Sequence, residues 1–190
     1  MTKVIALTGG IASGKSTVGK MLKDKNFDVI DLDKTVHDLE NENKDVINKI
    51  VKLFGVKTTN NGKINRSQLA EIVFNDKNAL KRLVRILNPF LIKEINSHTD
   101  EDVIFIEAPT LFENGLQVYV DKIIMIACDP VIQMQRLIKR NTISISKANL
   151  LMKSQWPQSV KKELSDVVID STNGIDELKK QVLCLLDDLR

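Results

Sequence analysis

The chain has 190 residues, of which 43% are hydrophobic and 28% charged, and its formal net charge is +3. These values are typical of one globular domain with insertions, and they argue against two independent large domains and against a strongly basic surface for nucleic acid. Aromatic residues make up only 4% of the chain, so isoleucine, leucine and valine must build the core. A small anionic substrate is compatible with the modest positive charge.

The amino terminus, Met1-Thr2-Lys3, leads directly into an apolar run, and we find neither a signal sequence nor an apolar stretch long enough to cross a membrane. Cys128 and Cys184 lack the spacing of a metal site and are expected to be buried free thiols. We therefore expect a cytoplasmic protein with no membrane partner. The sequence does not indicate its oligomeric state.

Residues 9–16 read GGIASGKS and lie between a predicted strand at 4–8 and a predicted helix at 15–25. In the pattern GxxxxGK[ST], the backbone N–H groups of a glycine-rich turn and the positive end of the next helix bind phosphates. A triphosphate is the expected ligand, and a chance glycine-rich turn is the alternative. The sequence thus predicts a nucleotide-binding loop.

Each position of this loop has an expected role. Gly9 and Gly14 permit backbone angles that a side chain forbids, Lys15 reaches the β- and γ-phosphates, and the Ser16 hydroxyl binds Mg²⁺. Thr17 is a weaker candidate for the metal. The expected nucleotide-binding residues are Gly10, Ile11, Ala12, Ser13, Gly14, Lys15, Ser16 and Thr17.

Two aspartates lie at the end of the second predicted strand, residues 27–31. We expect Asp31-Leu32-Asp33 to close this strand, with both carboxylates on the same side, at the edge of the sheet where ligands bind. One of them would then take a proton from an attacking hydroxyl. A helix cap at Asp33, before a helix over 34–40, is the alternative, and the two roles are compatible.

About seventy residues separate the second and third predicted strands, far more than a crossover connection requires. Helical spacing of apolar residues predicts a helix over 45–54 in this segment. We expect a helical insertion over the carboxyl edge of the sheet, where a second substrate would bind. His37 and His98 have no third ligand at metal-site spacing and are expected to be surface histidines.

Further strands are predicted at residues 103–107, 122–127 and 167–170, alternating with helical patterns. This alternation predicts an α/β fold, with a mainly parallel five-stranded sheet flanked by helices. Glu107 ends the first of these strands and is expected near Mg²⁺, where the acid is usually aspartate; a solvated strand end is the alternative. Glu113, on the next loop, is a candidate for substrate or metal contact.

Asp129 and Pro130 predict the start of a helix, because they provide an N-cap and a first-turn proline. This helix carries Arg136, Lys139 and Arg140. Such cations stabilise charge on a transferring phosphoryl group, and a solvated helix end is the alternative.

Two expectations concern the carboxyl-terminal part. Trp156, beside Pro157, is expected to pack at a helix boundary rather than to stack on a nucleotide. A last helix is predicted over residues 176–189.

The chain resembles the dephospho-CoA kinases along nearly its full length. The phosphate loop is shared with many enzymes, but the blocks GKINRSQLAEIVF at 62–74 and EAPTLFE at 107–113 are much more specific. Together they distinguish the chain from adenylate, guanylate and shikimate kinases. Other segments in the family's order are IDLD at 30–33, FG at 54–55, LNP at 87–89, RLIKR at 136–140 and SDVVID at 165–170.

The resemblance implies a P-loop kinase core, about residues 1–33 and 101–190, with a helical acceptor-binding region at about 34–100 and a mobile lid at about 140–160. It implies transfer of the γ-phosphoryl group of ATP, with Mg²⁺, to the ribose 3′-hydroxyl of dephospho-CoA, the last step of coenzyme A synthesis. On this basis Lys15 is catalytic, Asp33 is the base for the hydroxyl, Arg140 is a lid cation, and Arg66 lies in the acceptor region.

The chain departs from the family pattern at His37, Asn88, Glu107, Thr110, Leu150 and Ser171. His37 and Leu150 stand where arginine is usual or frequent, which removes two possible anion contacts. Two other functions stay open. One is a kinase for a different hydroxyl, such as that of a nucleoside monophosphate, and the other is a non-catalytic nucleotide-binding protein whose acceptor site has decayed.

Overall fold

Residues 2–98 and 101–188 are described in the computed structural model, and the chain divides into two units. Unit 1 spans Met1–Ile30 and His98–Arg190, and unit 2 spans Asp31–Ser97. Among the described residues, no helix combines the length and the apolar composition that crossing a membrane requires.

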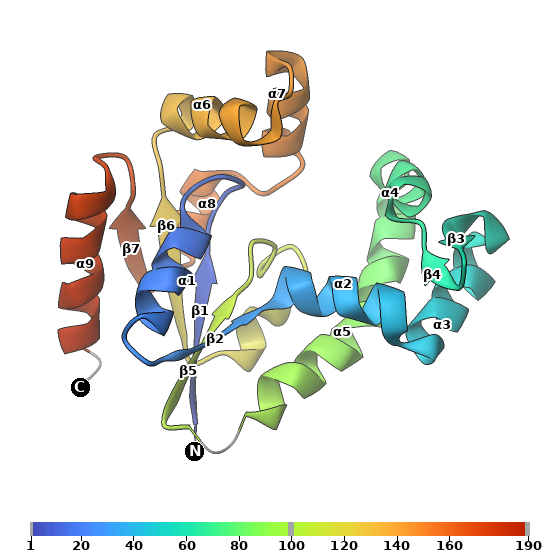
Figure 1. Ribbon diagram of the computed structural model, residues 1–190, viewed down its shortest axis with the longest axis horizontal. Coiled ribbons are helices and arrows are strands. Elements are labelled where there is room, and N and C mark those ends of the chain that lie inside the picture. Colours follow the sequence, from blue (N-terminus) through green and yellow to red (C-terminus); the bar gives the residue numbers. More distant parts are fainter. Residues whose placement is uncertain (1, 99–100, 189–190) are drawn as a thin grey trace. The chain divides into compact units, whose positions relative to one another are not determined.

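Unit 1 is built on a five-stranded sheet whose order is β2-β5-β1-β6-β7 (Figure 1). The central strand β1 pairs in parallel with β5 and with β6, and β6 pairs in parallel with β7. These parallel pairs within a five-stranded sheet confirm the predicted α/β fold class. The strands are β1 (Lys3–Thr8), β2 (Asp28–Asp31), β5 (Val103–Glu107), β6 (Lys122–Ala127) and β7 (Val167–Asp170).

The helices of unit 1 flank this sheet, and α6 and α7 lie beyond the carboxyl ends of its strands (Figure 1). The main core packs α1 and α9 against the sheet and is almost wholly aliphatic. Its fully buried Phe105 meets the Phe27 ring edge-on at 5.4 Å. The elements are α1 (Lys15–Lys23), η2 (Leu116–Tyr119), α6 (Pro130–Asn141), α7 (Ile145–Lys153), α8 (Gln158–Glu163) and α9 (Ile175–Asp187).

Two helix boundaries in unit 1 test the sequence predictions directly. Asp129 caps α6, because its Oδ1 accepts hydrogen bonds from the N–H groups of Val131 at 2.8 Å and Ile132 at 3.2 Å. The predicted cap is confirmed. The last helix, α9, starts one residue before its predicted start, and its predicted end at Leu189 lies outside the described residues.

Unit 2 is the long segment between β2 and β5, and it is mostly helical with a core of its own. Its core gathers Val46, Ile47 and Ile50 of α3 with Leu83 and Leu87 of α5. Asn43 separates α2 from α3 and caps the latter by accepting from the Val46 N–H group at 3.1 Å. The elements are α2 (Leu32–Glu42), α3 (Lys44–Phe54), η1 (Val56–Thr58), β3 (Thr59–Asn60), β4 (Lys63–Ile64), α4 (Arg66–Asn75) and α5 (Lys77–Ser97).

The predicted geometry of Asp31 and Asp33 is wrong. β2 ends at Asp31, and the next residue, Leu32, already begins α2. Asp31, not Asp33, caps this helix, because its Oδ1 accepts from the N–H groups of Asp33 at 3.0 Å and Lys34 at 3.1 Å. This cap starts the helix at Leu32, and the alternation of side chains along the strand ends there. The two carboxylates therefore do not share one face of a strand.

One of the two cysteine predictions also fails. Both thiols are free, and Cys128, just after β6, is buried as expected. Cys184 is exposed on α9, because this helix buries only the face that includes Leu178, Val182 and Leu185.

Candidate active site

The phosphate loop joins β1 to α1 through backbone angles that restrict its sequence. Gly9 has φ 140° and Gly14 has φ 101°, and residues with a side chain rarely adopt such positive φ angles. A Cβ atom on Gly9 would also collide with the carbonyl oxygen of Ile126 in β6. The expected need for glycine at these two positions is confirmed.

We therefore expect Gly9→Ala to lower the free energy of unfolding by about 1–3 kcal/mol, the usual cost of overpacking a filled site. Urea denaturation measures this change. Gly62→Ala is the matched control, since Gly62 also has a positive φ, of 77°, but a Cβ there would meet nothing within 4 Å. Equal losses in the two variants would mean that the backbone angle, and not the collision with Ile126, restricts Gly9.

Lys15 begins α1 and turns its ammonium group back across the loop. Its Nζ donates to the carbonyl oxygens of Gly9 at 3.0 Å and Gly10 at 2.9 Å, and the residue is buried. Ser16 and Thr17 follow in the first turn of the helix and are exposed. The loop thus presents one buried cation and two accessible hydroxyls at a helix N-terminus, a combination that favours anions.

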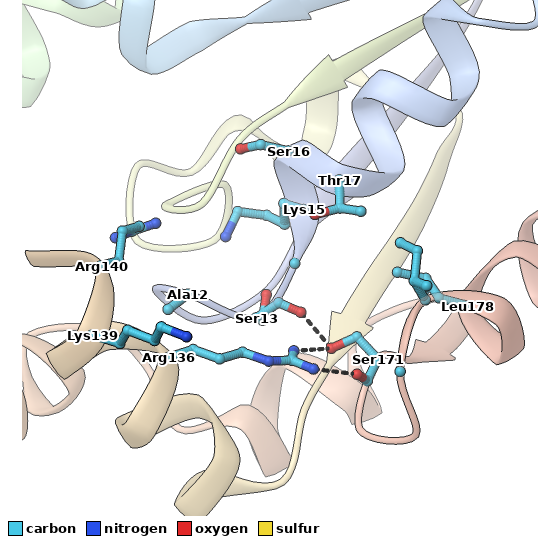
Figure 2. A pocket seen from close by; sticks show the side chains of 13 residues that line it. Ala12, Ser13, Lys15, Ser16, Thr17, Arg136, Lys139, Arg140, Ser171 and Leu178 are labelled. Carbon is cyan, nitrogen blue, oxygen red and sulfur yellow. Dashed lines mark hydrogen bonds between the residues drawn. The ribbon is translucent and has the colours of Figure 1, made fainter.

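A cavity of about 580 Å³ opens beside this loop, entirely within unit 1. Three segments line it: residues 12–17 of the loop, the cationic face of α6, and the chain from Ser171 to Leu178 after β7. In Figure 2 the cations of α6 lie on one side of the loop and Leu178 on the other. The expected loop residues from Ala12 to Thr17 and all three expected cations, Arg136, Lys139 and Arg140, contribute to the lining.

Arg136 joins two of these segments. Its guanidinium donates to the Oγ of Ser171 at 3.0 Å and to the Ser171 carbonyl at 2.8 Å, while the Ser171 hydroxyl donates to the carbonyl of Ser13 at 2.6 Å (Figure 2). The alternative of a solvated helix end is therefore wrong for Arg136, which is half-buried. Arg140 is exposed, and its Nε donates to Asn141 Oδ1 at 2.9 Å.

Glu107 ends β5 and is 8% exposed, so the alternative of a solvated strand end is wrong. Its carboxylate lies against Gly19 of α1, where a Cβ atom would collide with it. Gly19 is three residues after Ser16 and shares its face of the helix. Among the described residues, no three His, Cys, Asp or Glu side chains gather to hold a metal ion by themselves.

Glu113 takes part in a buried ion pair that fixes the loop after β5. The Lys161 Nζ, with no exposed surface, contacts Glu113 Oε1 at 2.7 Å and donates to the Pro109 carbonyl at 2.7 Å. The same Glu113 oxygen accepts from the backbone N–H group of Trp156 at 2.8 Å, and the Trp156 ring stacks on Phe112 with centroids 6.3 Å apart. Trp156 thus packs on Phe112, with 44% of its surface exposed, and the expected absence of a nucleotide stack on it stays a prediction.

We expect Lys161→Met to destabilise the protein by about 3 kcal/mol, because it leaves the Glu113 carboxylate buried without its cation. Urea denaturation of this variant and of the double variant Lys161→Met/Glu113→Leu provides the test. The double variant should recover part of the loss, since no isolated charge remains buried. Lys162→Met, at the exposed neighbouring position, is the control; a loss as large as that of Lys161→Met would contradict the explanation.

Unit 2 carries the two other predicted site residues. Asp33 is exposed, as the second residue of α2, and Arg66 is the first residue of α4. Arg66 Nε pairs with Glu40 Oε2 at 3.0 Å, and its Nη1 lies 3.2 Å from His37 Nδ1. Burial raises the pKa of the Glu40 carboxyl above its usual value, and the nearby Arg66 and His37 partly offset this rise.

Comparison with known proteins agrees with this geometry. A family model described as dephospho-CoA kinase matches residues 3–177. A dephospho-CoA kinase from Fusobacterium nucleatum is 40% identical over 183 residues, which cover 94% of each chain.

Two solved structures resemble the chain over its whole length, and one of them is a dephospho-CoA kinase. The protein TT1252 from Thermus thermophilus superposes with a TM-score of 0.85 at 28% identity, and a dephospho-CoA kinase from Campylobacter jejuni with 0.68 at 27% identity. Each match covers 100% of this chain and 98% of the other. With a phosphate loop, a cationic helix and a family match over nearly the whole chain, this protein belongs to the dephospho-CoA kinase family.

Proposed function

We propose that this protein transfers the γ-phosphoryl group of ATP to the ribose 3′-hydroxyl of dephospho-CoA, giving CoA and ADP. The observation that carries the proposal is the cavity in which Lys15 and the α1 N-terminus meet Arg136, Lys139 and Arg140. Phosphoryl transfer depends mainly on positioning and on stabilising charge at the phosphate oxygens, and this cavity supplies cations for both. Family membership over residues 3–177 supports the choice of acceptor.

In this proposal the triphosphate binds over residues 12–17. Backbone N–H groups and the α1 N-terminus hold its oxygens, and the Lys15 ammonium exchanges its bonds to the Gly9 and Gly10 carbonyls for bonds to the β- and γ-phosphates. Arg140 lies at the start of the proposed lid, residues 140–160. As an exposed cation it would contact the transferring group when the lid closes over it and excludes water.

The residues around the loop fit a magnesium ion. Mg²⁺ in kinases is held by substrate phosphates, waters and one or two protein oxygens, so a cage of three acids is not required. Ser16 provides an accessible hydroxyl, and the Glu107 carboxylate lies against the same face of α1. We propose that these two residues hold the ion, which neutralises charge on the phosphates when bound.

For the acceptor, we propose that unit 2 binds dephospho-CoA, with Arg66 contacting its anionic groups. Asp33 takes the proton of the 3′-hydroxyl, and the resulting oxygen bonds to the γ-phosphorus while the bond from that phosphorus to the β–γ bridging oxygen breaks. ADP carries away the electron pair of the broken bond. A contact between Glu113 and substrate stays a prediction, since its Oε1 already holds Lys161.

An ADP-release assay with ATP and Mg²⁺, with and without dephospho-CoA, tests the proposal. We expect ADP release that depends on dephospho-CoA, together with a product one phosphate heavier by mass spectrometry. ADP formed only with nucleoside monophosphates or other alcohols would assign a different kinase activity. ATP binding with no turnover on any acceptor would favour a non-catalytic protein.

A further inference from the structure

Two glutamines from distant parts of unit 1 hold the main chain of the phosphate loop at Ile11. The Ile11 N–H group donates to Gln155 Oε1 at 2.7 Å, and the Ile11 carbonyl accepts from Gln133 Nε2 at 2.7 Å. Gln133 belongs to α6, and Gln155 lies between α7 and α8. Both polar groups of one loop residue are therefore bonded to side chains rather than left for a ligand.

A third glutamine fixes the direction of the Gln133 amide. The Gln158 Nε2 donates to Gln133 Oε1 at 2.9 Å and to the Cys128 carbonyl at 3.0 Å, while the Gln158 Oε1 accepts from the Cys128 N–H group at 3.2 Å. Because Cys128 uses both its N–H and its carbonyl, the Gln158 amide has only one satisfactory orientation. Gln133, which is buried, must then direct its Nε2 toward Ile11.

The geometry of the loop shows what this arrangement accomplishes. Ala12, the next residue, has φ 59°, an angle that costs energy for a residue with a side chain. Gly10, the preceding residue, has no room for a Cβ atom, which would collide with Gln133 Nε2. The cavity lining begins at Ala12, so the bonded residue stands immediately before the segment that meets the ligand.

We infer that Gln133 and Gln155 are positioning residues that hold the phosphate loop in its anion-binding conformation before the nucleotide arrives. Binding then does not have to order the loop or satisfy the Ile11 peptide groups, so more of the interaction with phosphate appears as affinity. The inference rests on the nucleotide-binding part of the proposed function and not on the identity of the acceptor.

The test replaces each glutamine by methionine, which is similar in length but forms none of these hydrogen bonds. Calorimetry with inorganic tripolyphosphate and with ADP measures affinity at a temperature where circular dichroism shows every variant folded. We expect Gln133→Met and Gln155→Met each to weaken binding about fivefold, the usual effect of losing one net hydrogen bond. In the kinase assay the KM for ATP should rise by the same factor, while kcat changes less than twofold.

A direct readout separates this role from general stability. In wild-type protein the Ile11 amide hydrogen should exchange slowly with solvent, and in Gln155→Met it should exchange quickly. Gln155→Glu keeps an oxygen acceptor and should restore slow exchange. Gln135→Met, at an exposed position of α6, is the matched control and should match wild type in affinity and in exchange.

Tripolyphosphate affinity within twofold of wild type in both methionine variants would overturn the inference. If the buried Gln133 variant does not fold, Gln155→Met alone decides, because Gln155 is half-buried in a connecting segment. Neither binding probe involves dephospho-CoA, so a failure of the proposed reaction would appear in the ADP-release assay and not in these affinities.

Discussion

Replacing Lys15 by alanine should reduce kcat/KM for ATP by about 10²- to 10³-fold, the effect typical of removing one donor to developing charge. The Lys15 ammonium is buried in the loop at the N-terminus of α1, whereas the cations Arg136, Lys139 and Arg140 of the cavity lining belong to α6. ADP release under steady-state conditions measures the change. Far-ultraviolet circular dichroism and the melting temperature provide the folding control, and both should stay close to those of wild type.

Lys20→Ala is the matched control for this experiment. Lys20 is exposed on the same helix and does not line the cavity within the described part of the chain, so it should leave kcat/KM unchanged. Full activity of the Lys15 variant would refute the assignment of this loop to the triphosphate.

Asp33→Asn should lower kcat by about 10²- to 10⁴-fold, because asparagine keeps the shape of the side chain but cannot accept the proton of the 3′-hydroxyl. The KM for ATP should change less than twofold, since the nucleotide cavity is formed by unit 1 and Asp33 belongs to unit 2. Initial rates over a matrix of ATP and dephospho-CoA concentrations separate these effects.

Asp38→Asn serves as the control for charge on α2, because Asp38 is exposed on the same helix. It should retain wild-type kcat. An unchanged kcat in Asp33→Asn would remove Asp33 as the base, whereas equal losses in both variants would show that the net charge of the helix matters and not one carboxylate.

The strands were the easiest part of the fold to predict. Those at residues 103–107, 122–127 and 167–170 have the predicted bounds. The first two are mostly buried, and buried parallel strands require uninterrupted apolar runs that few other structures tolerate. The boundary between β2 and α2 was missed for a different reason. In the sequence, an aspartate that caps a helix cannot be told from one that ends a strand. The structure distinguishes them, because Asp31 accepts hydrogen bonds from the N–H groups of Asp33 and Lys34.

Some residues of the candidate site could also be predicted from the sequence, and others could not. The phosphate loop is one contiguous segment with a fixed spacing, so its residues are visible in the sequence. Three residues that contact this loop lie far from it in the sequence: Ser171, Gln155 and Gln133 are 158, 144 and 122 residues away from their partners. A local sequence pattern does not predict such contacts. In the sequence, Ser171 was identified only as a departure from the family pattern. For Glu40 the sequence offers one weak indication, its i,i+3 spacing from His37 on α2.

The pairing of β1 has a consequence for the order in which the protein assembles on the ribosome. Lys3 pairs with Val103 of β5, and Ile5 pairs with Lys122 of β6. The first strand therefore cannot pair with either neighbouring strand until more than half of the chain has been synthesised. The helical segment Asp31–Ser97 is contiguous and has its own core, so it can fold as soon as it emerges. The phosphate loop, among the first residues translated, is thus among the last to reach its final conformation, when Ser171 arrives to bond Ser13.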